Sequence, residues 1–136
     1  GVGIMAHLGL RPQSVAVLGG YKTQGRTQRD MEEIVSQAVQ YEKAGAVSLL
    51  LEAVPPEVSQ AVVENVKIPV IGCGAGPACD GHVVVMHDIL KLSPRSPKFA
   101  PQIANVGDAI KTAFAEYKNM IETGAYPGKE HVYSML

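Results

Sequence analysis

The chain has 136 residues, of which 46% are hydrophobic and 18% are charged, so it can bury a core and lacks the composition of a disordered segment. Its 12 basic and 13 acidic residues give a net charge of −1, which together with their scatter argues against a nucleic-acid or membrane-surface partner. No apolar run approaches the roughly 20 residues of a membrane span. The two cysteines, Cys73 and Cys79, match no zinc or redox motif and fit a reducing compartment.

The first predicted elements are a strand, a loop and a helix. Residues 2–7 form a short apolar strand, and residues 8–20 form the loop that follows it. A helix is predicted to start after a cap at Thr27 or Asp30 and to end near Ala44, with Gly45 as its C-cap. Its apolar positions recur at helical spacing, at Met31, Ile34, Val35, Ala38, Val39 and Tyr41.

Two further strands flank a short helix. Residues 46–52 are a nearly continuous apolar run, which is typical of a parallel strand buried on both faces. Pro55 and Pro56 break this run, and residues 56–65 are predicted to be a helix with proline at its start. Residues 68–72 form the third strand. This alternation predicts an α/β fold with a parallel sheet, and it is compatible with both a barrel and an open sheet.

The C-terminal third is harder to assign. Residues 83–86 have strand propensity, but they follow the third strand after fewer residues than the dozen or so that a parallel crossover needs. We therefore predict a helix capped by Asp80, with Val83, Met86 and Leu90 on one face. A proline- and serine-rich loop then leads to a final helix over residues 102–122, ended by Gly124, and residues 125–136 are predicted to be an extended arm. The apolar stripe of the final helix is Ile103, Val106, Ile110, Phe114, Tyr117 and Ile121.

Two polar side chains stand where predicted strands end. Glu52 follows the apolar run and precedes a proline-enforced turn, and His7 ends the first strand. In α/β folds this edge is where ligands bind and catalytic side chains project. A partly desolvated carboxylate there is a good proton acceptor, so Glu52 is a candidate base, with a helix-capping or lysine-pairing role as the alternative. His7 alone is more often structural, but the two residues strengthen each other because they would face one pocket.

A glycine-rich turn at Gly72, Gly74 and Gly76 follows the third strand. Its GxGxG spacing and the proline after it do not fit a dinucleotide-binding loop. The turn either lets a ligand approach the backbone closely or is only a tight turn.

Two other groups of residues carry weaker signals. Residues 19–26 form a glycine-bracketed basic loop, which is either a mobile lid or a solvated connection. His82, His87 and Asp88 have no spacing that places three metal ligands on one face, so structural roles are favoured for them.

Longer motifs follow one another along the chain. HLGLRPQS at 7–14 matches H-[IL]-G-L-x-P-Q, and GGYKTQGR at 19–26 matches GGYKxQGR. The other matches are LEAVP at 51–55, IPVIGCGAG at 68–76, DG at 80–81, HD at 87–88, PKF at 97–99 and YPGKEH at 126–131. On these motifs the chain resembles the C-terminal half of ketopantoate hydroxymethyltransferases over nearly all of its length. It departs from their pattern at Arg11, Ala53 and His82, where threonine, cysteine and glutamine are usual.

The resemblance implies a fold. This is a (β/α)8 TIM barrel of the phosphoenolpyruvate/pyruvate superfamily, in which residues 1–136 would be the C-terminal portion of one domain, with residues 125–136 as a tail. Because the sequence opens at Gly1 without methionine and passes at once into a strand, we expect it to be part of a larger fold. Half a barrel has two open sheet edges and an uncovered interior. The chain alone is therefore expected to be marginally stable or to associate, and to be inactive.

The resemblance also implies an activity, the transfer of a hydroxymethyl group from 5,10-methylenetetrahydrofolate to 3-methyl-2-oxobutanoate, which gives ketopantoate for pantothenate and coenzyme A biosynthesis. By matching motif, Glu52 would be the general base and His7 a substrate-binding residue. The loop with Gly72, Gly74 and Gly76 is a candidate cofactor contact. Mg2+ would stabilise the enolate, held by carboxylates of earlier strands, so no metal ligand is expected in this chain.

The expected partners are the keto acid and the folate, with a homo-oligomer as the complete assembly and with no nucleic acid or membrane. One alternative is another barrel enzyme that forms enolates of small keto acids. A second alternative is a half-barrel that acts only as a non-catalytic assembly module. The compartment would be cytoplasmic for a bacterial member and mitochondrial for a fungal or plant member, and these residues do not decide between them.

Overall fold

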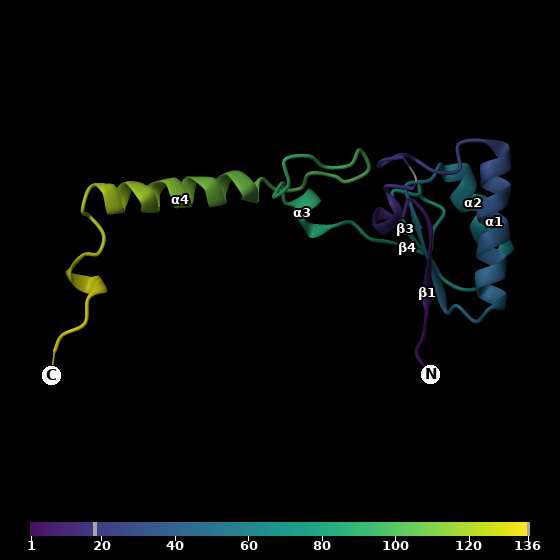
Figure 1. Cartoon of the computed structure of the whole chain (residues 1–136), viewed down its shortest axis with the longest axis horizontal. Coiled ribbons are helices and arrows are strands. Elements are labelled where there is room, and N and C mark those ends of the chain that lie inside the picture. The colour runs from purple at the N-terminus through teal and green to yellow at the C-terminus, as the bar shows by residue number, and fades with distance from the viewer. Residues whose placement is uncertain (18, 136) are drawn as a thin grey trace. The chain divides into compact units, whose positions relative to one another are not determined.

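A computed structural model describes residues 1–17 and 19–135 of the chain. It divides into two compact units, Gly1–Val84 and Val85–Leu136, and each is described by itself (Figure 1). The placement of the whole chain within one barrel domain stays a prediction.

A four-stranded parallel sheet forms the centre of the first unit. Its strands are β1 (Met5–Gly9), β2 (Ser48–Glu52), β3 (Val70–Cys73) and β4 (Gly81–His82), in the order β1-β2-β3-β4. The predicted α/β class with a parallel sheet is confirmed. The apolar pattern predicts the first strand at residues 2–7. The observed strand, Met5–Gly9, lies further towards the C-terminus and pairs there with β2.

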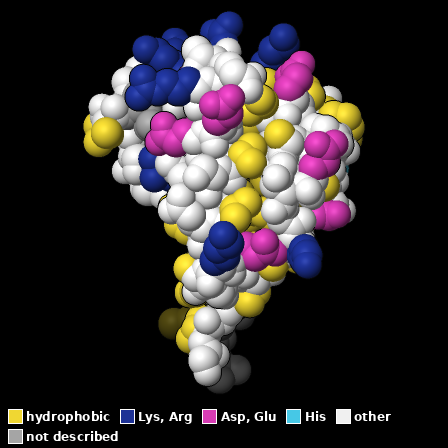
Figure 2. Space-filling view, turned by 90° about the vertical axis from the view of Figure 1, so that its right-hand side faces the viewer, with side chains coloured by type: hydrophobic (Ala, Val, Ile, Leu, Met, Phe, Trp, Pro, Cys, Tyr) yellow, Lys and Arg dark blue, Asp and Glu magenta, His cyan; other side chains and the backbone are white. Residues whose placement is uncertain are grey.

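Two helices cover one face of this sheet (Figure 1). Helix α1 spans Gln28–Lys43, and Thr27 caps it because its Oγ1 accepts a hydrogen bond from the amide of Asp30 at 3.1 Å. Helix α2 spans Pro56–Asn65, the bounds predicted from the prolines and the apolar pattern. Figure 2 looks onto the outer side of this helical layer, where hydrophobic side chains run down the middle.

The core lies between the helices and one face of the sheet. Because side chains alternate along a strand, every second residue of β1, β2 and β3 points into it. The buried members are Leu8, Leu49, Leu51 and Val70 from the strands and Ile34, Ala38, Val58 and Val62 from the helices. The intervening residues, among them His7, Leu50 and Ile71, point to the other face and are only partly buried. Within this unit, α1 and α2 therefore leave the second face of the sheet without a covering layer.

The prediction of a helix capped by Asp80 is wrong. Residues 81–82 instead form β4, and only Met86–Ile89 form a short helix, α3. The carboxylate of Asp80 accepts a hydrogen bond from the amide of Val70 at 2.8 Å, and the amide of Asp80 donates to the carbonyl of Val70 at 2.9 Å. These two bonds hold the chain beside β3, so the side chain that resembled a helix cap is a sheet partner.

The second unit contains α3 and the helix α4 (Val106–Glu122). The predicted start at residue 102 is wrong, because the amide of Ile103 donates to the carbonyl of Ile89 and the helix is capped by Asn105. The side-chain amide of Asn105 also donates a hydrogen bond to the carboxylate of Asp108, which lowers the pKa of Asp108. None of the side chains on α4 is buried, including its predicted apolar stripe. No helix in the described residues is long and apolar enough to cross a membrane.

Residues 125–131 do not form the extended arm that the sequence predicts, whereas residues 132–135 have no regular secondary structure. The amide of Tyr126 donates to the carbonyl of Met120, and its ring meets that of Tyr117 edge-on with centroids 5.3 Å apart. The ring of Tyr126 also contacts that of His131, with ring centroids 5.0 Å apart. Residues Lys129–His131 form a single 3-10 turn. The segment up to residue 131 therefore folds back onto the end of α4.

Cys79 provides a test of the packing around β3. Its side chain is buried in the core, and both this burial and the negative charge of Asp80 raise its pKa above the ordinary 9.0. We therefore expect iodoacetamide at pH 8 to alkylate Cys79 much more slowly in the native protein than in urea, because less thiolate forms and access is blocked. Since the folded pKa is raised, its contribution to stability should be complete below pH 9.0 and should decline as pH rises beyond it. Peptide mass spectrometry measures the alkylation, and equal rates in both solvents would contradict the packing.

Candidate active site at the carboxyl edge of the sheet

Glu52 is the last residue of β2, at the edge where the parallel strands end. The register places it between Gly9 of β1 and Cys73 of β3. Because Leu51 points into the core, Glu52 points to the face that the helices do not cover. Its side chain is 16% exposed, so it is largely enclosed by protein but still accessible to solvent. The structure thus places Glu52 at the strand end and on the accessible face that the sequence indicated.

The backbone around Glu52 is held from both neighbouring strands. The amide of Leu10 donates to the carbonyl of Glu52 at 2.8 Å, and the amide of Ala53 donates to the carbonyl of Cys73 at 2.9 Å. Ala53 has a φ of 49°, a left-handed conformation that is uncommon without glycine, and its carbonyl accepts from the amide of Gln24 at 3.0 Å. The chain therefore turns sharply after Glu52, and three hydrogen bonds fix that turn.

His7 approaches Glu52 from β1. It lies opposite Leu50 in the register, two positions before the residue that faces Glu52, and on the same face of the sheet. Its Nε2 is 3.1 Å from Oε2 of Glu52, with side chains 23% and 16% exposed respectively. Nε2 is enclosed by protein, and no atom in the described parts of the chain meets hydrogen-bond geometry with it. The contact with Glu52 is therefore a close polar contact without hydrogen-bond geometry.

This arrangement suits proton transfer. A partly exposed carboxylate with a fixed backbone and an imidazole at its side has the composition of a general-base site. The two candidates that the sequence singled out, Glu52 and His7, are brought together, whereas His82 is not. In the register, His82 pairs with Gly72, and Gly72 pairs with Leu51, which points into the core. His82 therefore points to the face opposite Glu52.

The glycine-rich turn has a packing explanation. A Cβ on Gly72 would lie 2.9 Å from Sγ of Cys79, and a Cβ on Gly76 would lie 2.9 Å from Cβ of Pro56. Both glycines therefore let residues 74–80 pack against β3 and the start of α2, independently of any ligand. A cofactor contact by Gly72, Gly74 and Gly76 stays a prediction.

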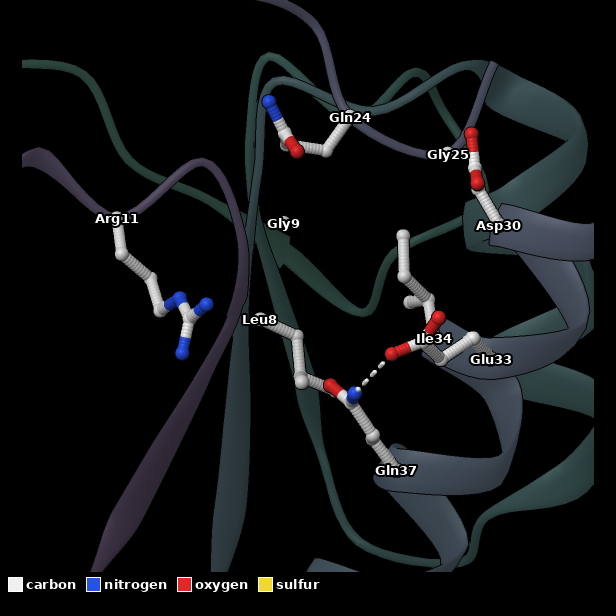
Figure 3. A pocket seen from close by; sticks show the side chains of 9 residues that line it. All are labelled: Leu8, Gly9, Arg11, Gln24, Gly25, Asp30, Glu33, Ile34 and Gln37. Carbon is white, nitrogen blue, oxygen red and sulfur yellow. Dashed lines mark hydrogen bonds between the residues drawn. The ribbon is translucent and has the colours of Figure 1, made fainter. Parts of the chain in front are cut away.

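A polar cavity of about 250 Å3 lies on the other side of β1 (Figure 3). Arg11 points towards it from one wall, and Asp30 and Glu33 of α1 stand on the opposite wall. Leu8 and Ile34, which belong to the helix-side core, line its floor, so the cavity does not open onto the Glu52 face. No sequence pattern indicated this cavity, because Asp30 and Glu33 resemble an ordinary solvated helix face.

A metal ion would need several ligating side chains close together. Among residues 1–17 and 19–135, no three His, Cys, Asp or Glu side chains lie close enough together to hold one. His87 and Asp88 are in α3 of the second unit and His82 is in β4 of the first.

Comparison with known proteins relates these residues to one family. Residues 1–129 match the family model described as ketopantoate hydroxymethyltransferase. The chain is 46% identical over 131 residues to the 3-methyl-2-oxobutanoate hydroxymethyltransferase of Pyrobaculum aerophilum, covering 96% of this chain and 50% of the relative. It is 45% identical to the enzyme of that name from Photorhabdus laumondii, covering 97% and 50% of the two chains. The chain thus spans about half the length of the curated relatives it matches.

Gly9 is predicted to be essential to the geometry around Glu52. It has a φ of 82°, and a Cβ there would lie 2.2 Å from the carbonyl oxygen of Glu52. We expect Gly9→Ala to lower the free energy of unfolding by about 1–2 kcal/mol for the backbone conformation, with about 1–3 kcal/mol more for the overlap.

Gly45→Ala is the matched control for this substitution. Gly45 also has a positive φ, 98°, but a Cβ there would meet nothing within 4 Å. Only the backbone cost should appear in this variant. Urea unfolding measures both, and equal losses would show that the contact with Glu52 does not matter.

Proposed function

The chain belongs to the ketopantoate hydroxymethyltransferase family, and on this basis we propose that the protein carrying it transfers a hydroxymethyl group from 5,10-methylenetetrahydrofolate to 3-methyl-2-oxobutanoate. The product would be ketopantoate, for pantothenate and coenzyme A biosynthesis. The observation that carries the proposal is the partly exposed carboxylate of Glu52 on a fixed turn at the carboxyl edge of the sheet, 3.1 Å from the imidazole of His7.

In this proposal Glu52 is the general base. The carbon next to the carbonyl of the keto acid loses its proton to the Glu52 carboxylate, and the electron pair of that C–H bond forms the enolate. The one-carbon unit then exchanges its two C–N bonds to the folate for a C–C bond to the enolate carbon and a C–O bond to an oxygen from water. The proton held by Glu52 and one proton of the water go to the two folate nitrogens, and tetrahydrofolate leaves. The backbone bonds around Glu52 support this role because they keep the carboxylate from moving with a flexible loop.

The described residues contain no group of three or more His, Cys, Asp or Glu side chains that could hold Mg2+. We therefore propose that any Mg2+ the protein uses to stabilise the enolate is held by other residues. The contribution of this chain is then the proton transfer and the shape of one side of the substrate pocket.

The same proposal extends to the fold. Four parallel strands with helices on one face are compatible with part of a (β/α)8 barrel of the phosphoenolpyruvate/pyruvate superfamily. The uncovered face with His7 and Glu52 would then be the barrel interior. In the complete protein, further strands would cover that face, and assembly into a homo-oligomer is part of the same proposal.

Replacing Glu52 by glutamine tests the base. The amide keeps the shape of the side chain but cannot accept the proton, so we expect solvent-deuterium exchange at the acidic carbon of 3-methyl-2-oxobutanoate to fall by about 100-fold or more. The exchange is followed by NMR in the full-length protein without folate, and ketopantoate formation is followed with folate.

Glu57→Gln, an exposed carboxylate in the first turn of α2, is the control and should leave both rates unchanged. Exchange that survives in Glu52→Gln would refute the base assignment. Exchange without ketopantoate formation in the unaltered protein would instead favour another enolate-forming enzyme of small keto acids. We expect residues 1–136 alone to show neither reaction.

A further inference from the structure

We propose that His7 acts through Glu52 rather than on the substrate. Its Nε2 holds Oε2 of the carboxylate and leaves Oε1 as the oxygen that takes the proton. This inference rests on the proposed function, because it assigns a positioning role within the same site. It also changes the role expected for His7 from the sequence, which was a substrate contact.

The first observation is the place of His7 in the register. Glu52 lies opposite Gly9, and His7 is two residues before Gly9 on the same face of β1. Diagonal neighbours on adjacent strands are within reach of long side chains, and a glutamate and a histidine both qualify. Gly9 has no side chain that would stand between them. The diagonal from Glu52 to His7 is therefore open, and the 3.1 Å contact uses it.

The second observation is the enclosure of Nε2. This atom is shielded from solvent, and no hydrogen-bond partner is found for it among the residues that the structure describes. A buried polar atom without a partner is destabilising, so the imidazole gains by drawing the nearest acceptor towards it. That acceptor is Oε2 of Glu52. A proton on Nε2 satisfies both groups, and the tautomer with Nδ1 unprotonated follows from this pairing.

The third observation is the freedom of the Glu52 side chain, which the backbone hydrogen bonds do not restrict. They fix the main chain at Glu52, but three side-chain torsions still separate the main chain from the carboxylate. A contact at one oxygen removes most of that freedom. Since a misplacement of about 1 Å at a reacting group can cost about 100-fold in rate, His7 would influence the deprotonation step without touching the keto acid.

Three substitutions in the full-length protein test this role. His7→Leu removes the donor at similar size, and His7→Gln keeps an N–H donor on a side chain of similar reach. We expect His7→Leu to lower kcat and the deuterium-exchange rate by about 10- to 100-fold, with KM for the keto acid within about two-fold of the original. His7→Gln should recover most of the rate. His82→Leu, on the opposite face of the same sheet, is the matched control and should change neither value.

A double substitution separates positioning from substrate contact. Equilibrium binding of 3-methyl-2-oxobutanoate is measured by calorimetry in Glu52→Gln and in Glu52→Gln combined with His7→Leu. The two affinities should agree, and the second change should not lower the residual exchange rate further, because His7 would act only through the carboxylate.

The other possible results would contradict either the role of His7 or the proposed function itself. A tenfold or larger rise in KM with kcat unchanged, or weaker keto acid binding in the double variant, would make His7 a substrate-binding residue and overturn the proposal while leaving the base in place. Exchange that persists in Glu52→Gln would overturn the proposed function itself. If His7→Leu fails to fold, 15N NMR of the unaltered protein and of Glu52→Gln decides the matter. Nε2 should be protonated in the unaltered protein and should lose that preference in Glu52→Gln, and an unchanged tautomer would overturn the pairing.

Discussion

The pairing of Gly9, Glu52 and Cys73 across three adjacent strands is the constraint on which the rest of the first unit depends. A slip of one residue in β2 would turn Glu52 into the core and Leu51 out to the uncovered face. The burial of Leu49 and Leu51 beneath the helices opposes such a slip, because each would lose its apolar environment. Hydrophobic packing on one face thus determines which residues are presented on the other.

The two faces of the sheet have different tasks. The face beneath α1 and α2 supplies the core, and it includes the turn residue Gly25, whose absent side chain makes room for Ile34 and Val58. The other face presents His7 and Glu52, whose side chains are partly exposed. The loop after β1 joins the two, because the amide of Gln24 donates to the carbonyl of Ala53. The stability of the helical layer is therefore transmitted to the turn that follows Glu52.

The sequence could predict the elements whose local pattern and tertiary role agree. Residues 56–65 are an example, since Pro56 sets the first helical turn and apolar residues recur on the face that becomes buried. The strand-end position of Glu52 followed from the same logic. His7, predicted to end the first strand, is instead the middle residue of β1, because that strand continues to Gly9. The contact between His7 and Glu52 could not be predicted, because it depends on the register and on the missing side chain of Gly9.

Asp80 shows where local patterns fail. A carboxylate before an apolar segment is as suitable for capping a helix as for accepting the amide of Val70, and the choice depends on a residue ten positions earlier. The predicted start of α4 is misplaced for a similar reason. Ile103 fits the helical stripe, but its amide is taken by the carbonyl of Ile89. In both places a contact distant in sequence overrides the local preference.

The two edge strands of the sheet, β1 and β4, are unequal in length. On the β4 side, the outermost strand has two residues, and Asp80 alone satisfies both main-chain groups of Val70 that face outwards. On the β1 side, a five-residue strand has no neighbour within the described part of the unit beyond β2. Unpaired main-chain groups invite another strand, and a very short edge blunts that tendency. The five-residue edge at β1 therefore offers an added strand a longer row of main-chain groups than the two-residue edge at β4 does.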